Sequence, residues 1–292
     1  MSGEKFPPIS VENEIYICMR RITPTLTAEL FYYFGNPKKV RIGESPAYPL
    51  QTFRELVEYV ARLSFMNKDY LLFYRGQAVD YRNKVGVSSF YPTIYRGDYL
   101  SQKDLSERFK KLKQTGLQLS SLFEEKKIEG YKEVKKRRNI QWSILQHYEV
   151  CPTPFLDFTH SLRVASSFAM SNNETDKAYV FIFGLPYLTN RISINSEHDL
   201  VNIRLLSICP PTALRPYFQE GYLVSTDGIT DSYDTKSELD FNNRLIAKFE
   251  IPNSPSFWGK DFDRIPEHLL YPENDPVLEL CKMITSDYTP IL

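Results

Sequence analysis

Glycine and cysteine are both scarce in this chain of 292 residues. There are 12 glycines and four cysteines. The shortage of glycine argues against a glycine-rich phosphate loop and against long flexible linkers. The cysteines are far apart and form neither a CxxC pair nor a zinc-type spacing; they are Cys18, Cys151, Cys209 and Cys281. The sequence therefore predicts no metal site.

The chain also lacks an excess of either charge and any long apolar run. Lysine plus arginine equals aspartate plus glutamate, at 36 each, so no overall field attracts the chain to nucleic acid or to an anionic membrane. No apolar run approaches the roughly 18 residues of a membrane span, and the first residues lack a signal-peptide pattern. We therefore expect a soluble, cytoplasmic protein with reduced cysteines and no membrane partner.

What the sequence does contain is a mixture of helix and strand patterns in clusters. A Thr-x-x-Glu capping box at Thr52 predicts a helix to about Ser64, and Asp275-Pro276 predicts the start of the last helix. Strands are expected at 14–19, 70–74, 178–184, 204–209 and 245–251, the last of them half-buried. Because strict strand–helix alternation is missing, we predict an α+β fold. We expect a single domain at residues 49–292, with a small mixed or antiparallel β core flanked by helices, preceded by an N-terminal extension at residues 1–48.

The stretch from Leu145 to Ala169 concentrates chemically active side chains. Seven lie within sixteen positions: Gln146, His147, Tyr148, Asp157, Thr159, His160 and Ser161. The pattern predicts the end of a helix from about Asn139, a proline turn, a short strand and a second helix. Because a buried, unpaired carboxylate is costly, Asp157 needs a donor such as a helix N-terminus or an arginine. The alternative is that Asp157 only caps a helix and His147 is a core residue.

An arginine follows the apolar run 70–74. A guanidinium at the end of a buried strand needs an anionic partner, and its planar fork suits phosphate and carboxylate equally well. Two partners stay open for Arg75: an external anion, or an internal ion pair with a carboxylate such as Asp157. We expect the candidate residues to line one pocket; they are Arg75, Gln146, His147, Asp157 and Gln219.

Residues 101–138 read as a helical insertion rich in positive charge. They contain 12 Lys/Arg against 6 Asp/Glu, most densely at 132–138. Such a basic face could contact a nucleic-acid backbone or an acidic partner. A solvated helical surface is the reading that we favour.

Three segments, in this order, carry a family resemblance: YRGQ at 74–77, SSFYPTIYR at 88–96, and LQHYEVCPTPFLDFTHSLRVASSFA at 145–169. They resemble the FRG domain, named for a Phe-Arg-Gly motif. Its central motif reads Leu-Gln-His-Tyr-Gly-Leu-Pro-Thr-Arg-Leu-Leu-Asp-Trp-Thr and is followed by an alanine-rich helix. The resemblance extends from about Thr52 to Ile284.

Two later segments add to the resemblance, and several positions depart from it. RPYFQEGYL at 215–223 is similar to the family's Arg-x-x-x-Gln-x-Gly-x-Phe, and LYPENDPV at 270–277 is similar to Leu-Phe-Pro-Asp-x-Asp-Gly. Glu149 replaces the motif's glycine and Pro154 its arginine, both beside the expected site. The other departures are Tyr74 for phenylalanine, Phe158 for tryptophan, and Tyr222 in the late aromatic segment.

The resemblance implies an activity. FRG domains often occur with bacterial toxin and phage-defence components, and their motif order is similar to that of the ADP-ribosyltransferase fold, which holds NAD without a Rossmann glycine loop. It therefore implies an NAD-dependent, ADP-ribosyltransferase-like enzyme that acts on a cellular macromolecule of unknown type. An antitoxin or another defence-system component is the implied protein partner.

The same resemblance implies roles for individual residues. Arg75 would pair with an NAD phosphate. The implied catalytic residues are Arg75, His147, Asp157, Gln219 and Glu220. The implied NAD contacts are Arg75, Gln77, Gln146, Tyr148, Thr159 and Ser161. Because Gln219 cannot ionise, the negative charge that stabilises a developing ribosyl cation would come from Asp157 or Glu149.

Two other functions remain open from the residues alone. One is a non-catalytic module that binds a nucleotide or a protein through the same pocket. The other is an RNA-directed enzyme that uses His147 as general base and residues 132–138 to contact the backbone, although nucleic acid is the less favoured partner.

Overall fold

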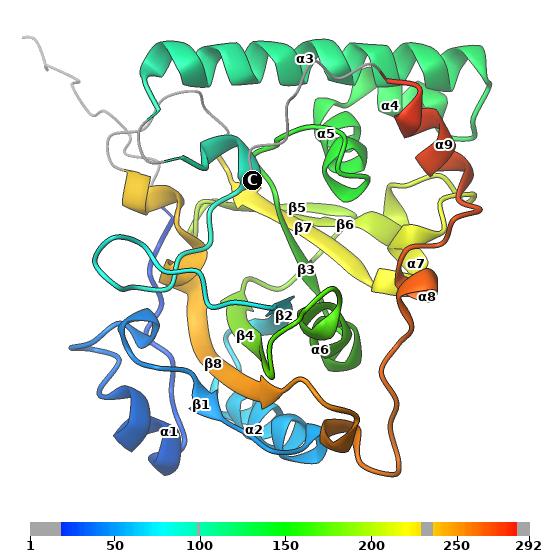
Figure 1. Cartoon of the computed structure of the whole chain (residues 1–292). Helices are drawn as coiled ribbons and strands as arrows, with labels where there is room; N and C mark the ends of the chain where they lie inside the picture. Colours follow the sequence, from blue (N-terminus) through cyan, green and yellow to red (C-terminus); the bar gives the residue numbers. More distant parts are fainter. Residues whose placement is uncertain (1–18, 98–99, 229–235, 285–292) are drawn as a thin grey trace, which may run out of the picture.

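A computed structural model of the chain describes residues 19–97, 100–228 and 236–284. Within these residues the chain forms nine α-helices and eight strands (Figure 1). The helices are α1 Ala28–Phe34, α2 Phe53–Met66, α3 Gln102–Glu125, α4 Tyr131–Lys136, α5 Arg138–His147, α6 Leu162–Met170, α7 Arg215–Gln219, α8 Glu267–Leu270 and α9 Pro276–Lys282. The strands are β1 Tyr48–Pro49, β2 Leu71–Gln77, β3 Leu156–Thr159, β4 Lys177–Leu185, β5 Ile192–Asn195, β6 Leu200–Arg204, β7 Gly221–Thr226 and β8 Leu245–Pro252. The fold is α+β, as the sequence predicts.

All eight strands belong to one mixed sheet, in the order β1-β8-β4-β2-β3-β7-β6-β5. Only β1 and β8 pair in parallel; every other neighbouring pair is antiparallel. The sheet is nearly divided in its middle, because β2 and β3 share a single register pair, Tyr74 with Thr159. On either side of this junction the pairing is long: β2 matches β4 over seven residues, from Leu71 to Gln77.

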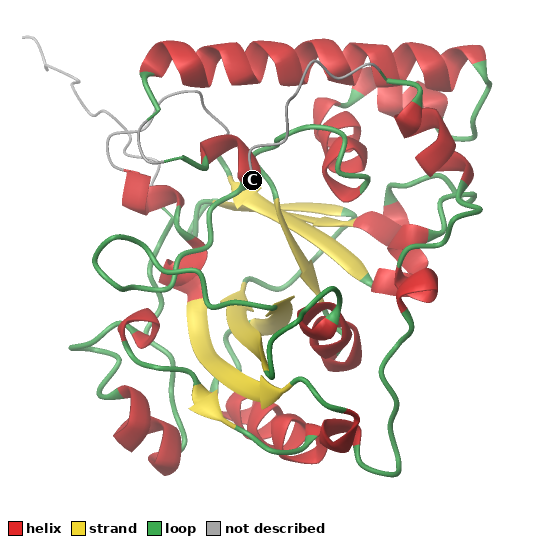
Figure 2. Ribbon diagram, in the orientation of Figure 1, coloured by secondary structure: helices red, strands yellow, loops and turns green. Residues whose placement is uncertain are grey.

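Each half of the sheet has its own helical cover (Figures 1 and 2). The half that contains β2, β4 and β8 shares a core with α1, α2 and α6. The half that contains β6 and β7 packs under α3, α4, α5 and α9. Strand β7 alternates between the two cores, with Tyr222 and Val224 in the first and Leu223 in the second, as the two-residue period of a strand requires. The first core therefore continues across the junction, whereas the second core covers only the opposite face of β6 and β7.

Several sequence predictions are confirmed, each where a local signal was strong. The Thr52 hydroxyl accepts from the Glu55 amide and the Glu55 carboxylate accepts from the Thr52 amide, which is the expected capping box at the start of α2. The helix–turn–strand–helix order of 145–169 appears as α5, β3 and α6. Asp275 caps α9 by accepting from the Val277 amide at 2.9 Å.

Other predictions need correction. The strand expected at 204–209 is wrong: β6 ends at Arg204, which pairs with Tyr222, and β7 has only Gly221 left before α7. A longer β6 would have no partner, so the chain turns into a short 3-10 helix. The sheet is larger than the small β core expected, and β8 is buried on both faces rather than on one. The strand expected at 14–19 lies outside the described residues except for Met19, which is not in a strand.

The N-terminal and helical segments pack onto the same body. Ile22, Leu30 and Phe34 belong to the core of the first half-sheet, so no separate core lies before residue 49 in the described part. The segment 101–138 is helical, as predicted, and buries one face of α3 against α5. No helix of the described residues is long and apolar enough to cross a bilayer.

Candidate functional site

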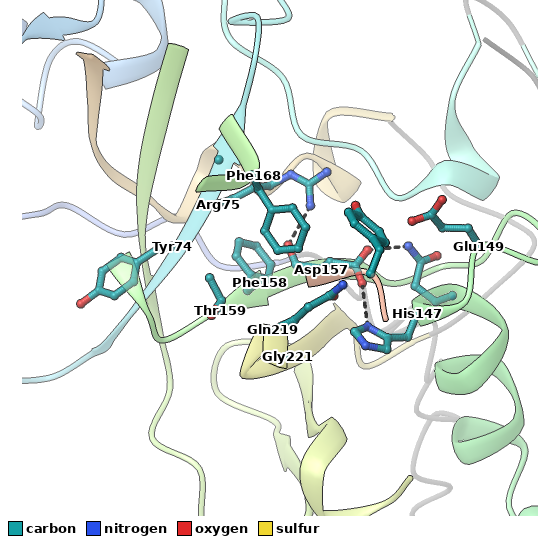
Figure 3. Close-up of a pocket in the computed structure, with 13 residues that line it drawn as sticks. Tyr74, Arg75, His147, Glu149, Asp157, Phe158, Thr159, Phe168, Gln219 and Gly221 are labelled. Carbon is teal, nitrogen blue, oxygen red and sulfur yellow. Dashed lines mark hydrogen bonds and ion pairs between the residues drawn. The ribbon is translucent and has the colours of Figure 1, made fainter. Parts of the chain in front are cut away.

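A cavity of about 280 Å³ opens where the two halves of the sheet meet. It is lined by all five residues that the sequence predicts to share one pocket, Arg75, Gln146, His147, Asp157 and Gln219. They arrive from β2, the end of α5, β3 and the end of α7. Figure 3 shows the side chains of Arg75, His147, Asp157 and Gln219 around the cavity. The predicted juxtaposition is confirmed; the chemical roles remain predictions.

Asp157 supplies the carboxylate at the centre of this cavity. Its neighbours on β3, Leu156 and Phe158, face the core, and the strand's period of two places Asp157 on the opposite side. Gln146 Nε2 donates to Asp157 Oδ2 at 2.6 Å, and the Thr153 hydroxyl donates to Gln146 Oε1. A buried amide therefore holds the carboxylate in one orientation while the Asp157 side chain keeps 40% exposure to the cavity. The donor to the Asp157 carboxylate is therefore a glutamine amide, and not the helix N-terminus or arginine that the sequence analysis expected.

Arg75 crosses the junction between the half-sheets. Its Nη1 donates to the main-chain carbonyl oxygen of Asp157 at 2.7 Å (Figure 3). This corrects two expectations: the strand continues to Gln77, and the internal partner is a carbonyl rather than a carboxylate. Burial lowers the Arg75 pKa to about 10; the Asp157 charge opposes this shift and Arg96 adds to it. Arg75 Nε is buried without a partner among the described atoms, and the side chain lines the cavity.

Gly76 is required because β2 touches α6 at this position. A Cβ on Gly76 would lie 1.8 Å from the Ala165 carbonyl oxygen and 2.8 Å from the Ala169 amide nitrogen. Both are backbone atoms of a packed helix, which cannot move aside as a flexible side chain can. The Arg-Gly pair thus has two separate uses: the arginine ties β2 to β3, and the glycine lets β2 lie against α6.

His147 lies at the end of α5 and forms the floor of the cavity. Its Nδ1 is 3.9 Å from Asp157 Oδ1, and its side chain is 3% exposed. A Cβ at Gly221 would come within 3.2 Å of His147 Cε1, so that glycine makes room for the imidazole beside β7. Arg215 Nη1 donates to the His147 carbonyl oxygen at 3.2 Å and fixes the end of the helix.

Of the two implied catalytic residues Gln219 and Glu220, only Gln219 lines the cavity. Gln219 ends α7, and its Nε2 donates to the Leu270 carbonyl oxygen at 2.7 Å. Glu220 adopts a left-handed conformation with φ of +45° and is exposed, outside the lining of the cavity. The amide of Gln219 faces the cavity as a polar wall, while the carboxylate of Glu220 is directed elsewhere.

Three further predicted contacts also lie elsewhere. The Tyr148 hydroxyl donates to Asp275 Oδ2 at 2.7 Å, and its ring packs against Arg215. Ser161 caps α6 by accepting from the Val164 amide. Gln77 lines a neighbouring cavity. Only Thr159 of the remaining candidates lines the cavity that contains Asp157.

His160, also among the chemically active residues of the central stretch, is half-buried and packs against aromatic rings outside the cavity. The centroid of its ring lies 4.0 Å from that of Phe73 and 4.3 Å from that of Tyr222, on which it stacks. Burial lowers its pKa to about 4, so it is neutral at physiological pH.

The sequence analysis missed three residues of this site. Thr153 orients Gln146, and the only available signal was its place in the resembled Pro-Thr motif. Phe168 and Tyr271 form an aromatic wall with ring centroids 5.7 Å apart. Their signals, a helical apolar face and a tyrosine in a proline-rich segment, do not indicate a cavity.

Comparison with known proteins identifies part of the chain. Residues 71–178 match the family model described as the FRG domain. The chain contains an FRG domain. No curated protein and no solved structure matches the chain. The matched range is narrower than the resemblance from Thr52 to Ile284, and the cavity of the FRG domain takes Gln219, Gly221 and Tyr271 from beyond it.

The structure explains one departure from the FRG motif. Glu149 stands where the motif has glycine, and its φ is +56°, in the left-handed region that favours glycine. The backbone at Glu149 therefore has the left-handed conformation expected for the motif's glycine. A residue with a side chain adopts this conformation at a cost in conformational energy. Its side chain lies at the rim of the cavity with its Oε1 4.0 Å from Arg215 Nη1.

Proposed function

We propose that this FRG domain cleaves the N-glycosidic bond of NAD and transfers ADP-ribose to an acceptor. One observation carries the proposal: a fixed carboxylate, Asp157, and an anion-binding guanidinium, Arg75, open onto the same cavity. A dinucleotide that donates a ribosyl group needs both, an anion-binding group for its phosphates and a negative charge beside its ribose.

The chemistry assigns a task to each side chain. The bond between ribose C1′ and the nicotinamide nitrogen breaks, and its electron pair neutralises the pyridinium that leaves. The positive charge that develops on the ribose is stabilised by the Asp157 carboxylate, which Gln146 holds in place. A lone pair of the acceptor then bonds to C1′, and the proton that the acceptor loses goes to His147, beside Asp157.

The aromatic wall supports this assignment. Phe168 and Tyr271 present apolar surface to the cavity, and an aromatic nicotinamide can stack on such rings. Burial raises the Tyr271 pKa to about 12, so its hydroxyl stays neutral and adds no charge that would compete with Asp157. A cavity of about 280 Å³ suits the nicotinamide-ribose end of a dinucleotide better than an entire polymer strand.

The basic segment gives little support to the RNA-directed alternative. Lys135 Nζ lies 2.8 Å from Glu124, Arg137 Nε lies 3.2 Å from Glu133, and Arg138 lies over the Trp142 ring. Its charges are thus partly neutralised by acidic neighbours, as on a solvated helical surface.

The test is release of nicotinamide from NAD in the presence of cell lysate, measured by chromatography, with mass spectrometry for ADP-ribose adducts. Asp157→Asn keeps an oxygen for the Gln146 amide but removes the charge. We expect release to fall at least about 10²-fold with an unchanged melting temperature. Asp261→Asn, which changes a carboxylate with 66% exposure that pairs with Arg54, is the matched control. Binding of ADP-ribose without any release would contradict transfer and favour the non-catalytic module.

A further inference from the structure

A second cavity adjoins the first and shares one residue with it. Its volume is about 900 Å³, and its walls come from the loop that follows β2, the segment around Arg96, and Lys236. Arg75 lines both cavities. The loop that follows β2 is cyan in Figure 1. A ligand that occupies the first cavity can therefore continue past Arg75 into the second.

The side chains that line the second cavity have an excess of positive charge, whereas the chain as a whole has no net charge. The described residues that line it include four cationic side chains and no aspartate or glutamate; the cationic ones are Arg75, Lys84, Arg96 and Lys236. Across the whole chain, positive and negative residues are equal at 36 each. A local excess of this kind favours an anionic ligand with more than one charge.

Arg75 and Arg96 carry like charges and line the same cavity. After burial, the charge of Arg96 is what further lowers the Arg75 pKa. Arg96 is nevertheless held in place, because its Nε donates to the Tyr91 carbonyl oxygen at 3.1 Å and its own carbonyl accepts from Arg108 at 2.8 Å. A fixed pair of like charges is a site that a phosphate or pyrophosphate would stabilise.

Aromatic side chains complete the cavity. The Tyr81 side chain is 59% exposed and lines the wall with Tyr91. Lys236 Nζ lies 5.0 Å from the centroid of the Tyr91 ring. Exposed tyrosine rings provide a face on which a nucleobase can stack.

We infer that the second cavity binds the adenosine diphosphate half of the dinucleotide, with Arg75 and Arg96 as the two phosphate ligands and Tyr81 beside the base. This rests on the proposed function, because it extends the same ligand from the Asp157 cavity into its neighbour. The residue that it adds to the site is Arg96, which lies in the SSFYPTIYR segment.

The experiment measures binding of ADP and of NAD by isothermal titration, and the steady-state constants for nicotinamide release. Arg96→Ala is expected to weaken ADP binding at least 10-fold and to raise KM for NAD by a similar factor with little change in kcat. Arg96→Lys should restore part of the affinity. Arg54→Ala, on the surface of α2 and in neither cavity, should bind ADP like the wild type.

The outcomes separate this inference from the proposed function. Binding of ADP that depends on Arg96, without nicotinamide release, supports the cavity and contradicts the transferase. If nicotinamide is released but both Arg96 variants bind ADP like the wild type, the inference that the second cavity binds ADP is wrong. The proposed transferase activity is then still supported. Lack of ADP binding by the wild type at millimolar concentration also overturns the inference. If Arg96→Ala does not fold, Lys84→Gln on the loop after β2 must weaken ADP binding several-fold; unchanged affinity there counts against the cavity.

Discussion

Arg75 can be removed from the fold at a moderate cost, and its removal should eliminate ligand binding. Among the described residues, the Arg75 side chain makes one hydrogen bond, from Nη1 to the Asp157 carbonyl oxygen at 2.7 Å. A hydrogen bond from a charged group contributes about 1.5–3 kcal/mol to stability. Burial lowers the Arg75 pKa to about 10, so charging this group costs free energy in the folded state at neutral pH. Arg75→Ala relieves that cost and loses the bond.

The two effects partly cancel. We expect Arg75→Ala to lower the free energy of unfolding by about 2 kcal/mol or less, because the bond is worth at most about 3 and part of it is recovered. For a chain of this size that corresponds to a fall in melting temperature of about 4 °C or less. Breaking a buried ion pair would instead cost about 3–5 kcal/mol, but Asp157's carboxylate keeps its bond from Gln146 in the variant.

The assay combines urea unfolding, followed by circular dichroism, with titration of ADP and measurement of nicotinamide release. Binding and release should both fall below detection in Arg75→Ala. Arg75→Lys should restore little, since a single ammonium cannot form the planar fork. At about 2 °C per kcal/mol, a structural loss of about 3–5 kcal/mol lowers the melting temperature by about 6–10 °C. A fall of about 6 °C or more, or unchanged ADP binding, would show that Arg75 is structural and that the reasoning is wrong.

Four other predictions concern stability and charge. Gly76→Ala should destabilise by about 3 kcal/mol or more in a urea titration, because its Cβ would meet the Ala165 carbonyl oxygen at 1.8 Å. Glu149→Gly should raise stability by about 0.5–1 kcal/mol, since relief of the left-handed strain, about 1–2 kcal/mol, exceeds the added entropy of the unfolded chain; a lower melting temperature would contradict this. Burial lowers the Lys248 pKa from 10.5 to about 8, so between these pH values only the unfolded chain holds the proton. Stability from this group should therefore rise with pH by up to about 1.4 kcal/mol per unit, and Lys248→Met should lack that rise. Reversing all four charges at 135–138 to glutamate should cost about 1 kcal/mol or less and leave nicotinamide release unchanged, because the ion pairs there are exposed.

The parts of the fold that the sequence predicted are those decided by neighbours in the chain. The capping box at Thr52 and the Asp275-Pro276 start of α9 each depend on residues within one helical turn. The central motif is similar: α5 ends before Glu149, which stands at the motif's glycine position with a left-handed backbone, and Ser161 caps α6. Such signals need no knowledge of distant partners.

The parts that were missed depend on distant partners. The end of β6 is set by where β7 begins, and no local pattern in 204–209 contains that limit. Lys248 alternates with apolar residues as a surface residue would, yet it is fully buried and donates to Asp80 at 3.1 Å and Ser88 at 2.6 Å. Those partners lie 168 and 160 positions away in the sequence. Because no local pattern indicates them, the alternation of 245–251 predicted a half-buried strand.

The candidate site follows the same division. Arg75, Gln146, His147 and Asp157 were predicted together because they share short motifs with dense chemistry, and the structure places them in one cavity. Tyr271 was missed because it reaches the cavity from a loop between α8 and α9 whose local pattern carries no such signal.

The single pairing between the halves of the sheet links the fold to its chemistry. If the antiparallel register of Tyr74 with Thr159 continued, β2 and β3 would pair Arg75 with Phe158 and Gly76 with Asp157 through their backbones, and the two strands would leave no cavity between them. Here only Tyr74 and Thr159 pair, and the Arg75 side chain supplies the next link by donating to the Asp157 carbonyl oxygen. The same residue thus closes the gap in the sheet and lines both cavities where they meet. An anion bound there would tie the two halves of the sheet together, so ligand binding should raise the stability of the junction as well as position the substrate.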